Sequence, residues 1–109
     1  MNILDNVLYE EITKLSAKIS TMEQDLQNLP KGCIYIRKGK NEMYVYRKWR
    51  EDEKILSEYL GKLSSSKTLS KIEKVNEYKL MFQKLKKEKQ NLKELKKAYR
   101  LILLKTKLN

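Results

Sequence analysis

The 109-residue sequence contains no histidine, one cysteine, one proline and three glycines. Without histidine the chain cannot build a Ser-His-Asp triad, a Cys-His pair or an imidazole metal site. Cys33 alone can form neither a cysteine zinc site nor an internal disulfide. We therefore expect a protein that is not an enzyme and that holds no metal or other cofactor. A lone cysteine is also typical of the reducing cytoplasm, which is the expected location.

Long apolar runs are missing as well. The longest, Leu101 to Leu104, is far shorter than the roughly 18 residues that a membrane span needs. The opening stretch MNILDNVLYE lacks the positively charged and apolar regions of a signal peptide. We expect neither a secretory leader nor a membrane partner.

Acidic residues are few beside basic ones: 14 Asp and Glu stand against 25 Lys and Arg, a net charge of +11. This excess suggests a polyanionic partner such as nucleic acid. The alternative is the lysine-rich surface of a protein from an AT-rich genome. The excess is uneven, with a net charge of −3 over residues 1 to 29, +3 over 30 to 61 and +11 over 62 to 109.

The first part of the chain has apolar residues alternately four and three positions apart, which is the pattern of a heptad seam. It predicts a helix over residues 2 to 29, with Asn2 or Asp5 as its cap and Pro30 as its end. The seam consists of Leu8, Ile12, Leu15, Ile19, Met22, Leu26 and Leu29.

The last part of the chain shows the same spacing and predicts a helix over residues 66 to 107, beginning between Ser66 and Ser70. Ser70 and Glu73 match a capping box. The seam consists of Tyr78, Met81, Leu85, Glu88, Leu92, Leu95, Tyr99 and Ile102, with Glu88 interrupting an apolar row.

Between the helices, residues 33 to 60 favour a three-stranded meander, because Ile, Tyr, Val and Trp recur there at period two. Gly39 suits the first hairpin loop, whereas the second linker has no glycine and leaves its turn type open. We expect Gly61 to end the third strand. The predicted strands are Cys33 to Lys38, Met43 to Arg50 and Lys54 to Leu60.

The predicted fold is α+β, a single domain over residues 1 to 109. Two matching seams predict that the long helices form an antiparallel coiled-coil hairpin, with the small antiparallel sheet inserted between them. Acidic residues beside the first seam are expected to pair with lysines beside the second. The apolar end of the second helix, Tyr99 to Leu104, predicts contact with another molecule, and we expect a homodimer there.

Basic and aromatic residues gather in the predicted sheet, which holds three of the four arginines. Arginine recognises phosphates and base edges, and an exposed sheet with aromatics can stack on bases. Either Tyr44 and its period-two partners or Arg47 and Trp49 face the ligand; the sequence leaves this open. The candidate nucleic-acid contacts in the sheet are Arg37, Lys38, Lys40, Tyr44, Tyr46, Arg47, Lys48 and Arg50.

A second candidate surface is a row of cations on the long helix. Lys86, Lys93 and Arg100 are seven positions apart and therefore share one flank, which makes them a candidate phosphate track. The alternative interpretation is a charged stripe that is merely solvated.

Four short motifs carry a resemblance to a family of short uncharacterised bacterial and mobile-element proteins. These are LPxG at Leu29 to Gly32, the Tyr-rich strand around Tyr44 and Tyr46, the turn from Arg50 to Lys54, and YLGK at Tyr59 to Lys62. The resemblance covers roughly residues 15 to 100. It implies the helix–meander–helix fold and no particular activity. This chain has Glu-Asp-Glu where that turn usually has glycines.

The meander followed by a helix is also loosely similar to the DNA-binding domain of phage-type integrases, whose sheet enters the major groove. That similarity implies contacts from Arg37, Arg47, Lys48 and Arg50, although the aromatic-glycine motif usual after the third strand is missing. The leading functional hypothesis is a module that binds DNA or RNA. The alternative is a small phage or mobile-element protein of the anti-CRISPR type, which binds and inhibits a host protein or a nucleic-acid-handling complex.

Overall fold

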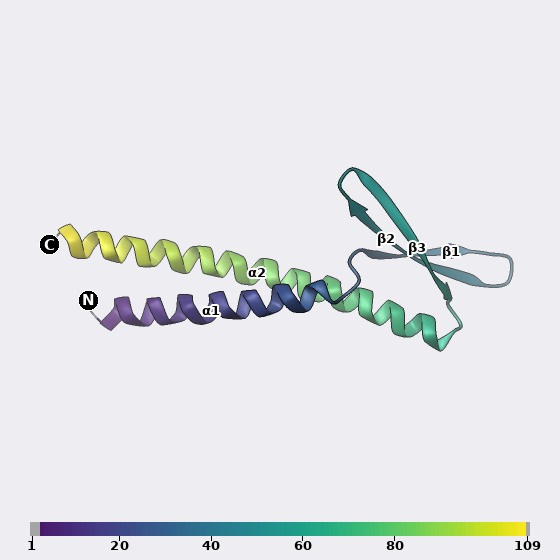
Figure 1. Cartoon of the computed structure of the whole chain (residues 1–109), viewed down its shortest axis with the longest axis horizontal. Coiled ribbons are helices and arrows are strands. Elements are labelled where there is room, and N and C mark those ends of the chain that lie inside the picture. The colour runs from purple at the N-terminus through teal and green to yellow at the C-terminus, as the bar shows by residue number, and fades with distance from the viewer. Residues whose placement is uncertain (1–2, 109) are drawn as a thin grey trace. The chain divides into compact units, whose positions relative to one another are not determined.

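The structure, a computed structural model, describes residues 3 to 108. It confirms an α+β class with an antiparallel three-stranded sheet between two long helices in chain order (Figure 1). The expected cap at Asn2 lies outside the described residues. The elements are α1 Ile3–Gln27, β1 Cys33–Lys38, β2 Met43–Glu51, β3 Lys54–Lys62 and α2 Ser66–Leu108.

The residues of the chain group into two compact units. One unit holds α1 as far as Asp25 together with α2 from Gln83 onward, and the other spans Leu26–Phe82. The second unit therefore holds the whole sheet and the first part of α2.

Helix α1 ends two residues earlier than the sequence predicts, at Gln27 rather than Leu29. The Leu29 amide donates to the Leu26 carbonyl oxygen at 3.1 Å and closes a tight turn just before Pro30. Proline disfavours helical geometry in the residue before it, so the helix cannot run up to the proline. Asp5 lies within the first turn of α1 rather than at its cap.

Helix α2 begins at Ser66, at the early end of the expected range. The Leu69 amide already donates to the Ser65 carbonyl oxygen at 3.2 Å, so the helix is under way before Ser70. The Ser70 hydroxyl donates to the Ser66 carbonyl oxygen at 3.3 Å, a bond typical of a helix interior. The predicted capping box at Ser70 is therefore wrong.

In the unit formed by the helices, the seam residues are all withdrawn from solvent, as is Asp5, which precedes the predicted seam. Ile19 and Leu85 are buried, with 6% and 5% of their surface exposed. The heptad pattern thus identifies the covered side of each helix. The half-buried seam residues of this unit are Leu8, Ile12, Leu15, Met22, Glu88, Leu92, Leu95, Tyr99 and Ile102.

Two ion pairs join α1 to α2 in this unit. Lys18 Nζ lies 3.1 Å from Glu88 Oε2, and Lys89 Nζ lies 3.7 Å from Glu23 Oε1. The second is a pair of the kind expected from the sequence. The first gives the acidic interruption of the α2 seam a partner.

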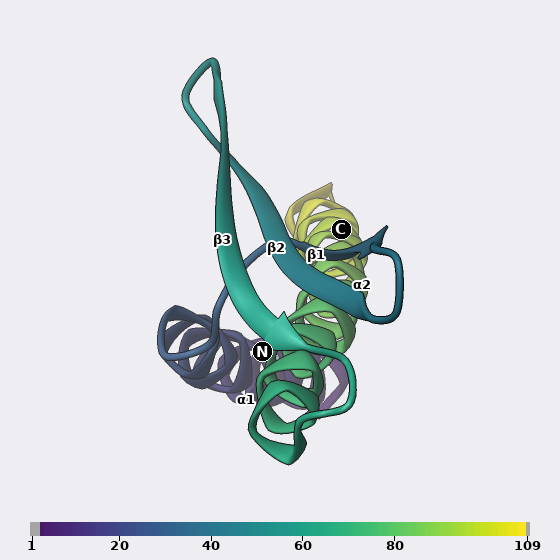
Figure 2. The same cartoon turned by 90° about the vertical axis from the view of Figure 1, so that its right-hand side faces the viewer.

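Strand β2 is the centre of the sheet and pairs antiparallel with both neighbours (Figure 2). The β1–β2 hairpin closes as expected, with the Gly39 amide donating to the Glu42 carbonyl oxygen at 2.8 Å. The β2–β3 hairpin closes after the Glu51–Lys54 pair. There Asp52 takes the left-handed conformation at φ 55°, which aspartate tolerates better than most residues and which replaces the missing glycine.

Strand β3 runs to Lys62, two residues beyond its predicted end. Val45 pairs with Gly61 while Tyr46 pairs with Tyr59, so Leu60 is an extra residue that forms a β-bulge. Gly61 has φ 137°, a conformation that side-chain-bearing residues rarely adopt. Because a bulge lets the ladder continue after an irregular residue, this glycine bends the strand without ending it.

Candidate nucleic-acid interface

The sheet has two unlike faces, because successive side chains of a strand point to opposite sides. The pairing register places Val45, Arg47 and Trp49 of β2 on one side, which we call the inner face. The other side we call the tyrosine face. Its strand residues are Cys33, Tyr35, Arg37, Tyr44, Tyr46, Lys48, Arg50, Ile55, Ser57, Tyr59 and Lys62.

The inner face packs against the first part of α2. Val45 is fully buried, and Leu60 and the α2 residue Val75 are 6% and 2% exposed. The Lys71 side chain of α2 donates to the Leu60 carbonyl oxygen at 3.3 Å. These residues form the core of the second unit and leave the tyrosine face as the free side of the sheet.

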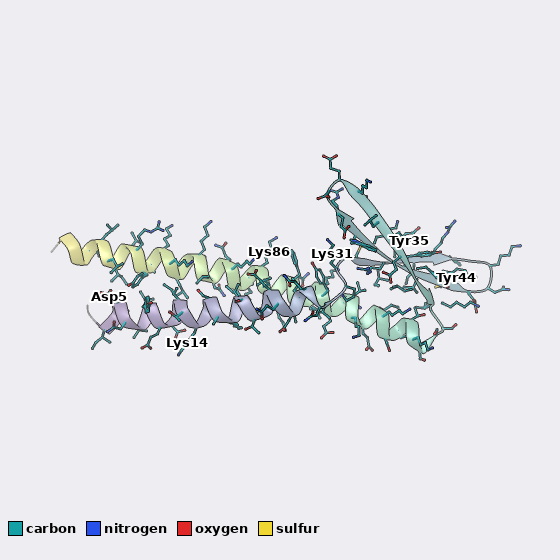
Figure 3. All side chains as sticks on the ribbon, viewed as in Figure 1. Asp5, Lys14, Lys31, Tyr35, Tyr44 and Lys86 are labelled. Carbon is teal, nitrogen blue, oxygen red and sulfur yellow. The ribbon has the colours of Figure 1, made fainter. Side chains whose placement is uncertain are left out.

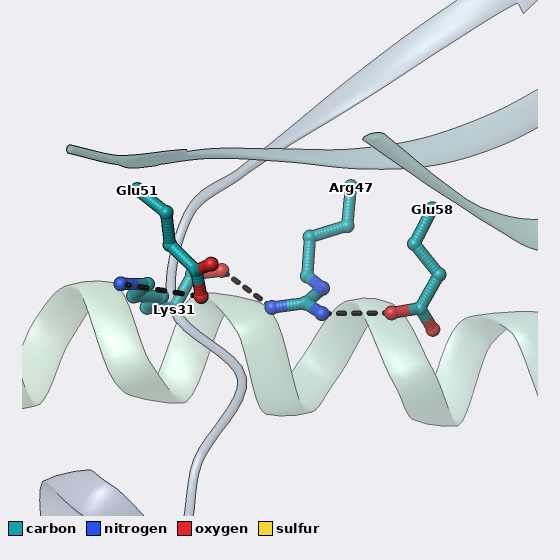
Figure 4. Close-up of polar contacts among 4 residues, drawn as sticks. All are labelled: Lys31, Arg47, Glu51 and Glu58. Atoms are coloured by element: carbon teal, nitrogen blue, oxygen red, sulfur yellow. Dashed lines mark hydrogen bonds and ion pairs between the residues drawn. The ribbon is translucent and has the colours of Figure 1, made fainter. Parts of the chain in front are cut away.

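Arg47 belongs to this packed side. Its guanidinium donates to the Lys31 carbonyl oxygen at 2.8 Å and to Glu58 Oε2 at 2.7 Å (Figure 4). Its Cζ also lies 3.8 Å from the centroid of the Trp49 ring. With 14% of its side chain exposed, Arg47 ties the loop before β1 to β3 and is not presented to a ligand.

The tyrosine face carries four tyrosines whose rings form a continuous row of contacts. Ring centroids are 6.4 Å apart for Tyr35 and Tyr46, 5.2 Å for Tyr46 and Tyr59, and 6.3 Å for Tyr59 and Tyr44. All three contacts are tilted by about 50°. Tyr35 and Tyr59 are 44% and 50% exposed, so the row offers aromatic surface to solvent (Figure 3).

Cations border these rings. The Lys48 ammonium lies 3.9 Å from the centroid of the Tyr35 ring, which is cation–π geometry. Arg37 and Arg50 are exposed on the outer strand and at the end of β2. No carboxylate is among the eleven strand residues of the face, which carry four positive charges. Such a surface favours anions.

One carboxylate approaches the face from the β1–β2 loop. Glu42 Oε2 lies 3.1 Å from Lys62 Nζ. The hydrogen bond to Glu42, reinforced by its negative charge, raises the pKa of the Lys62 ammonium above its ordinary value of 10.5. Lys62 therefore stays charged, with part of its charge already matched.

A hollow of about 500 Å³ opens on this side of the sheet. Three tyrosine rings and two cationic residues from the strands surround it. Its lining residues are Arg37, Lys38, Gly39, Tyr44, Tyr46 and Tyr59.

The structure brings together most of the predicted sheet residues. Arg37, Tyr44 and Tyr46 meet at the hollow, with Lys48 and Arg50 further along the same face. Lys38 also lines the hollow, but it pairs with Met43 and so belongs by register to the inner face. Two predicted residues are placed apart from this group. Lys40 lies in the hairpin loop and lines a neighbouring hollow of about 520 Å³, and Arg47 is on the inner face.

The predicted helix residues lie in the other unit. Lys86, Lys93 and Arg100 are all exposed on α2, and within the described part of the chain they have no ion-pair partner (Figure 3 labels Lys86). They remain a separate candidate surface, because the structure brings none of them to the tyrosine face within one unit.

Three aromatic or basic residues of the face are missing from the predicted contacts: Tyr35, Tyr59 and Lys62. The period-two pattern already placed Tyr59 beside Ile55 and Ser57, but only the β2–β3 register shows that its ring meets Tyr46. Lys62 was hidden by the bulge, which returns the chain to the tyrosine face after Gly61. No sequence signal distinguishes that bulge from a strand end.

Within residues 3 to 108, no cluster of three or more potential metal-binding side chains occurs, and neither helix is apolar enough over a sufficient length to cross a membrane. Comparison of the chain with family models, with curated proteins and with solved structures found no match.

Proposed function

We propose that this protein is a non-catalytic module that binds nucleic acid through the tyrosine face. The single observation that carries the proposal is the composition of that face, four contacting tyrosines and four cations with no carboxylate among its strand residues. Cations neutralise phosphates and release counterions, and aromatic rings offer contact surface to bases. The net charge of +11 adds long-range attraction for a polyanion.

The exposed flank of α2 is the proposed second contact. Lys86, Lys93 and Arg100 recur at heptad spacing and therefore form one line. Their charges are not matched by described carboxylates, unlike that of Lys89, which faces Glu23. Such a line suits phosphates and carries no base specificity.

We further propose that α1 and α2 pack as an antiparallel coiled coil in their unit. Tyr9 and Tyr99 have ring centroids 6.3 Å apart, while Lys18 meets Glu88. The partner on α2 thus moves to a lower number as the position on α1 rises, which is an antiparallel arrangement. The coiled coil would be the scaffold, and the sheet the site of recognition.

The test is binding to a fluorescently labelled nucleic acid over a range of salt concentrations. Affinity is expected to fall steeply as salt rises, because each phosphate contact releases counterions. Arg50→Gln on the tyrosine face is expected to weaken binding. Lys14→Gln removes the same charge from α1, where the side chain is 74% exposed, and serves as the matched control.

Absence of binding to any DNA or RNA strand at about 50 mM salt would overturn the proposal. Retention of a single host protein in a pull-down, unchanged after nuclease treatment, would then favour an inhibitor of a host protein. Equal effects of Arg50→Gln and Lys14→Gln would mean that net charge, rather than the tyrosine face, drives the association.

A further inference from the structure

The hollow of the tyrosine face is lined by both aromatic and cationic residues. Tyr59 is its central ring, in contact with both Tyr46 and Tyr44, and half of its surface is exposed. Arg37 and Lys38 come from β1 at the edge of the same hollow. A ligand in this place meets ring faces and positive charge together.

Tyr35 is the exception in the row. The Lys48 ammonium already lies over its ring, 3.9 Å from the centroid. One face of Tyr35 is therefore engaged within the protein, and the rings that line the hollow are those of Tyr44, Tyr46 and Tyr59.

These rings match one form of nucleic acid better than the other. In a duplex the faces of the bases are stacked on one another, and a protein can reach only phosphates and base edges, which are read by long polar side chains and by bidentate arginines. Single strands expose the faces of their bases, which stack on aromatic side chains while a basic surface follows the backbone. Three tyrosines and a single arginine line this hollow.

We infer, on the basis of the proposed function, that the tyrosine face takes unpaired bases of single-stranded nucleic acid. A base stacks in the hollow against Tyr59 and its neighbours, and Arg37, on the same face, holds the adjoining phosphate.

The test compares three labelled probes of the same length, about 12 nucleotides. They are an oligo-dT strand, a duplex, and a strand whose central nucleotides are abasic and which keeps all its phosphates. The oligo-dT strand is expected to bind at least about tenfold more tightly than either of the others, because stacking of each base is worth roughly 5- to 150-fold.

Substitution of the central ring gives the second arm. Tyr59→Leu is expected to weaken binding of oligo-dT by about 5- to 150-fold and to leave binding of the abasic strand unchanged. Tyr59→Phe keeps the ring and is expected to retain affinity, which separates stacking from damage to the fold. Tyr9→Leu changes a tyrosine of α1 that is 58% exposed, against 50% for Tyr59, and is the control.

The possible outcomes distinguish failure of the single-strand inference from failure of the proposed nucleic-acid binding. Equal affinity for oligo-dT, duplex and abasic strands overturns the single-strand inference and leaves nucleic-acid binding intact. Tighter binding of the duplex does the same. Loss of affinity in Tyr59→Leu for all three probes alike also overturns it, since stacking is then not what the residue contributes. Failure of every probe, and of RNA strands of the same length, to bind overturns the proposed function itself.

Discussion

Arg47 and Lys48 are neighbours in the chain with opposite roles. The pleat of β2 sends Arg47 to the inner face, where Glu58 and the Lys31 carbonyl use its donors, and sends Lys48 to the tyrosine face. These bonds use two separate guanidinium nitrogens, Nη1 and Nη2, where a lysine would offer a single ammonium. One of the arginines expected to contact nucleic acid is thus used within the protein, where it ties the loop before β1 to β3.

Glu42 offsets part of the positive charge of the tyrosine face by pairing with Lys62. Replacing it with glutamine (Glu42→Gln) should lower the pKa of Lys62 towards 10.5, because the hydrogen bond and the charge that raise it are weakened or lost. Titration of the lysine side chain by NMR measures this change. Since pairing raises the pKa in the folded state, its contribution to stability is complete below pH 10.5 and is lost as the pH rises through the raised value.

The same variant should bind nucleic acid more tightly, because a carboxylate beside the tyrosine face has been removed. Glu73→Gln makes the same change of net charge on an exposed helical residue and is the control. An equal gain in both variants would show that net charge alone matters.

Gly61 is required by both its conformation and its surroundings. Gly61→Ala should lower the free energy of unfolding by about 1–3 kcal/mol, because φ 137° strains an L-residue and the added methyl group would collide with the hydroxyl of buried Thr68. Urea denaturation measures the change. Ser57→Ala, exposed on the same strand, should stay within about 0.5 kcal/mol. If Gly61→Ala also lowered the free energy of unfolding by no more than about 0.5 kcal/mol, glycine would not be required at the bulge.

At the scale of elements, the heptad spacing predicted both helices and their covered sides, because a 3.5-residue repeat leaves few other arrangements. Their ends were less predictable. The turn at Leu26 to Leu29 and the start at Ser66 depend on single backbone hydrogen bonds that leave no periodic signal. The choice of sheet face was not predictable either, since both faces of β2 carry aromatic and basic residues. Only the burial of Val45 and Leu60 on one face of the sheet, together with that of Val75 on α2, decides it.

Glu88 tests the packing of the helices. The residue is in an apolar seam with 21% of its side chain exposed and pairs with Lys18. Glu88→Leu should raise the free energy of unfolding by about 1 kcal/mol, because burial of an apolar side chain there exceeds the small value of a partly exposed ion pair. Glu94→Leu, at an exposed position off the seam, should change it by less than about 0.5 kcal/mol. Destabilisation by Glu88→Leu in urea would argue against a coiled-coil seam.

At the scale of the whole molecule, most of the positive charge is on α2, whereas the proposed site of recognition is on the sheet. Replacing Lys86, Lys93 and Arg100 together with glutamine should therefore weaken binding without changing preference for bases. The slope of log affinity against log salt should become shallower by about 2 for a single strand, through the loss of three phosphate contacts. A control that changes Lys84, Lys87 and Lys105, which by helical position lie on other flanks of α2, should alter the slope less. Equal changes of the slope in the two triple variants would indicate that the overall positive field, rather than the row of Lys86, Lys93 and Arg100, attracts the phosphates.

Cys33 is exposed and belongs to the tyrosine face, in one cross-strand row with Lys48 and Ser57. As the only cysteine, it can be joined by a disulfide to nothing but another molecule. Air oxidation would therefore link two copies through the surfaces proposed for recognition and would mask both. The affinity for nucleic acid measured with a preparation kept without reductant would therefore be too low. The same thiol accepts a single maleimide dye beside Tyr35, so the unmodified sequence carries one labelling position on the tyrosine face.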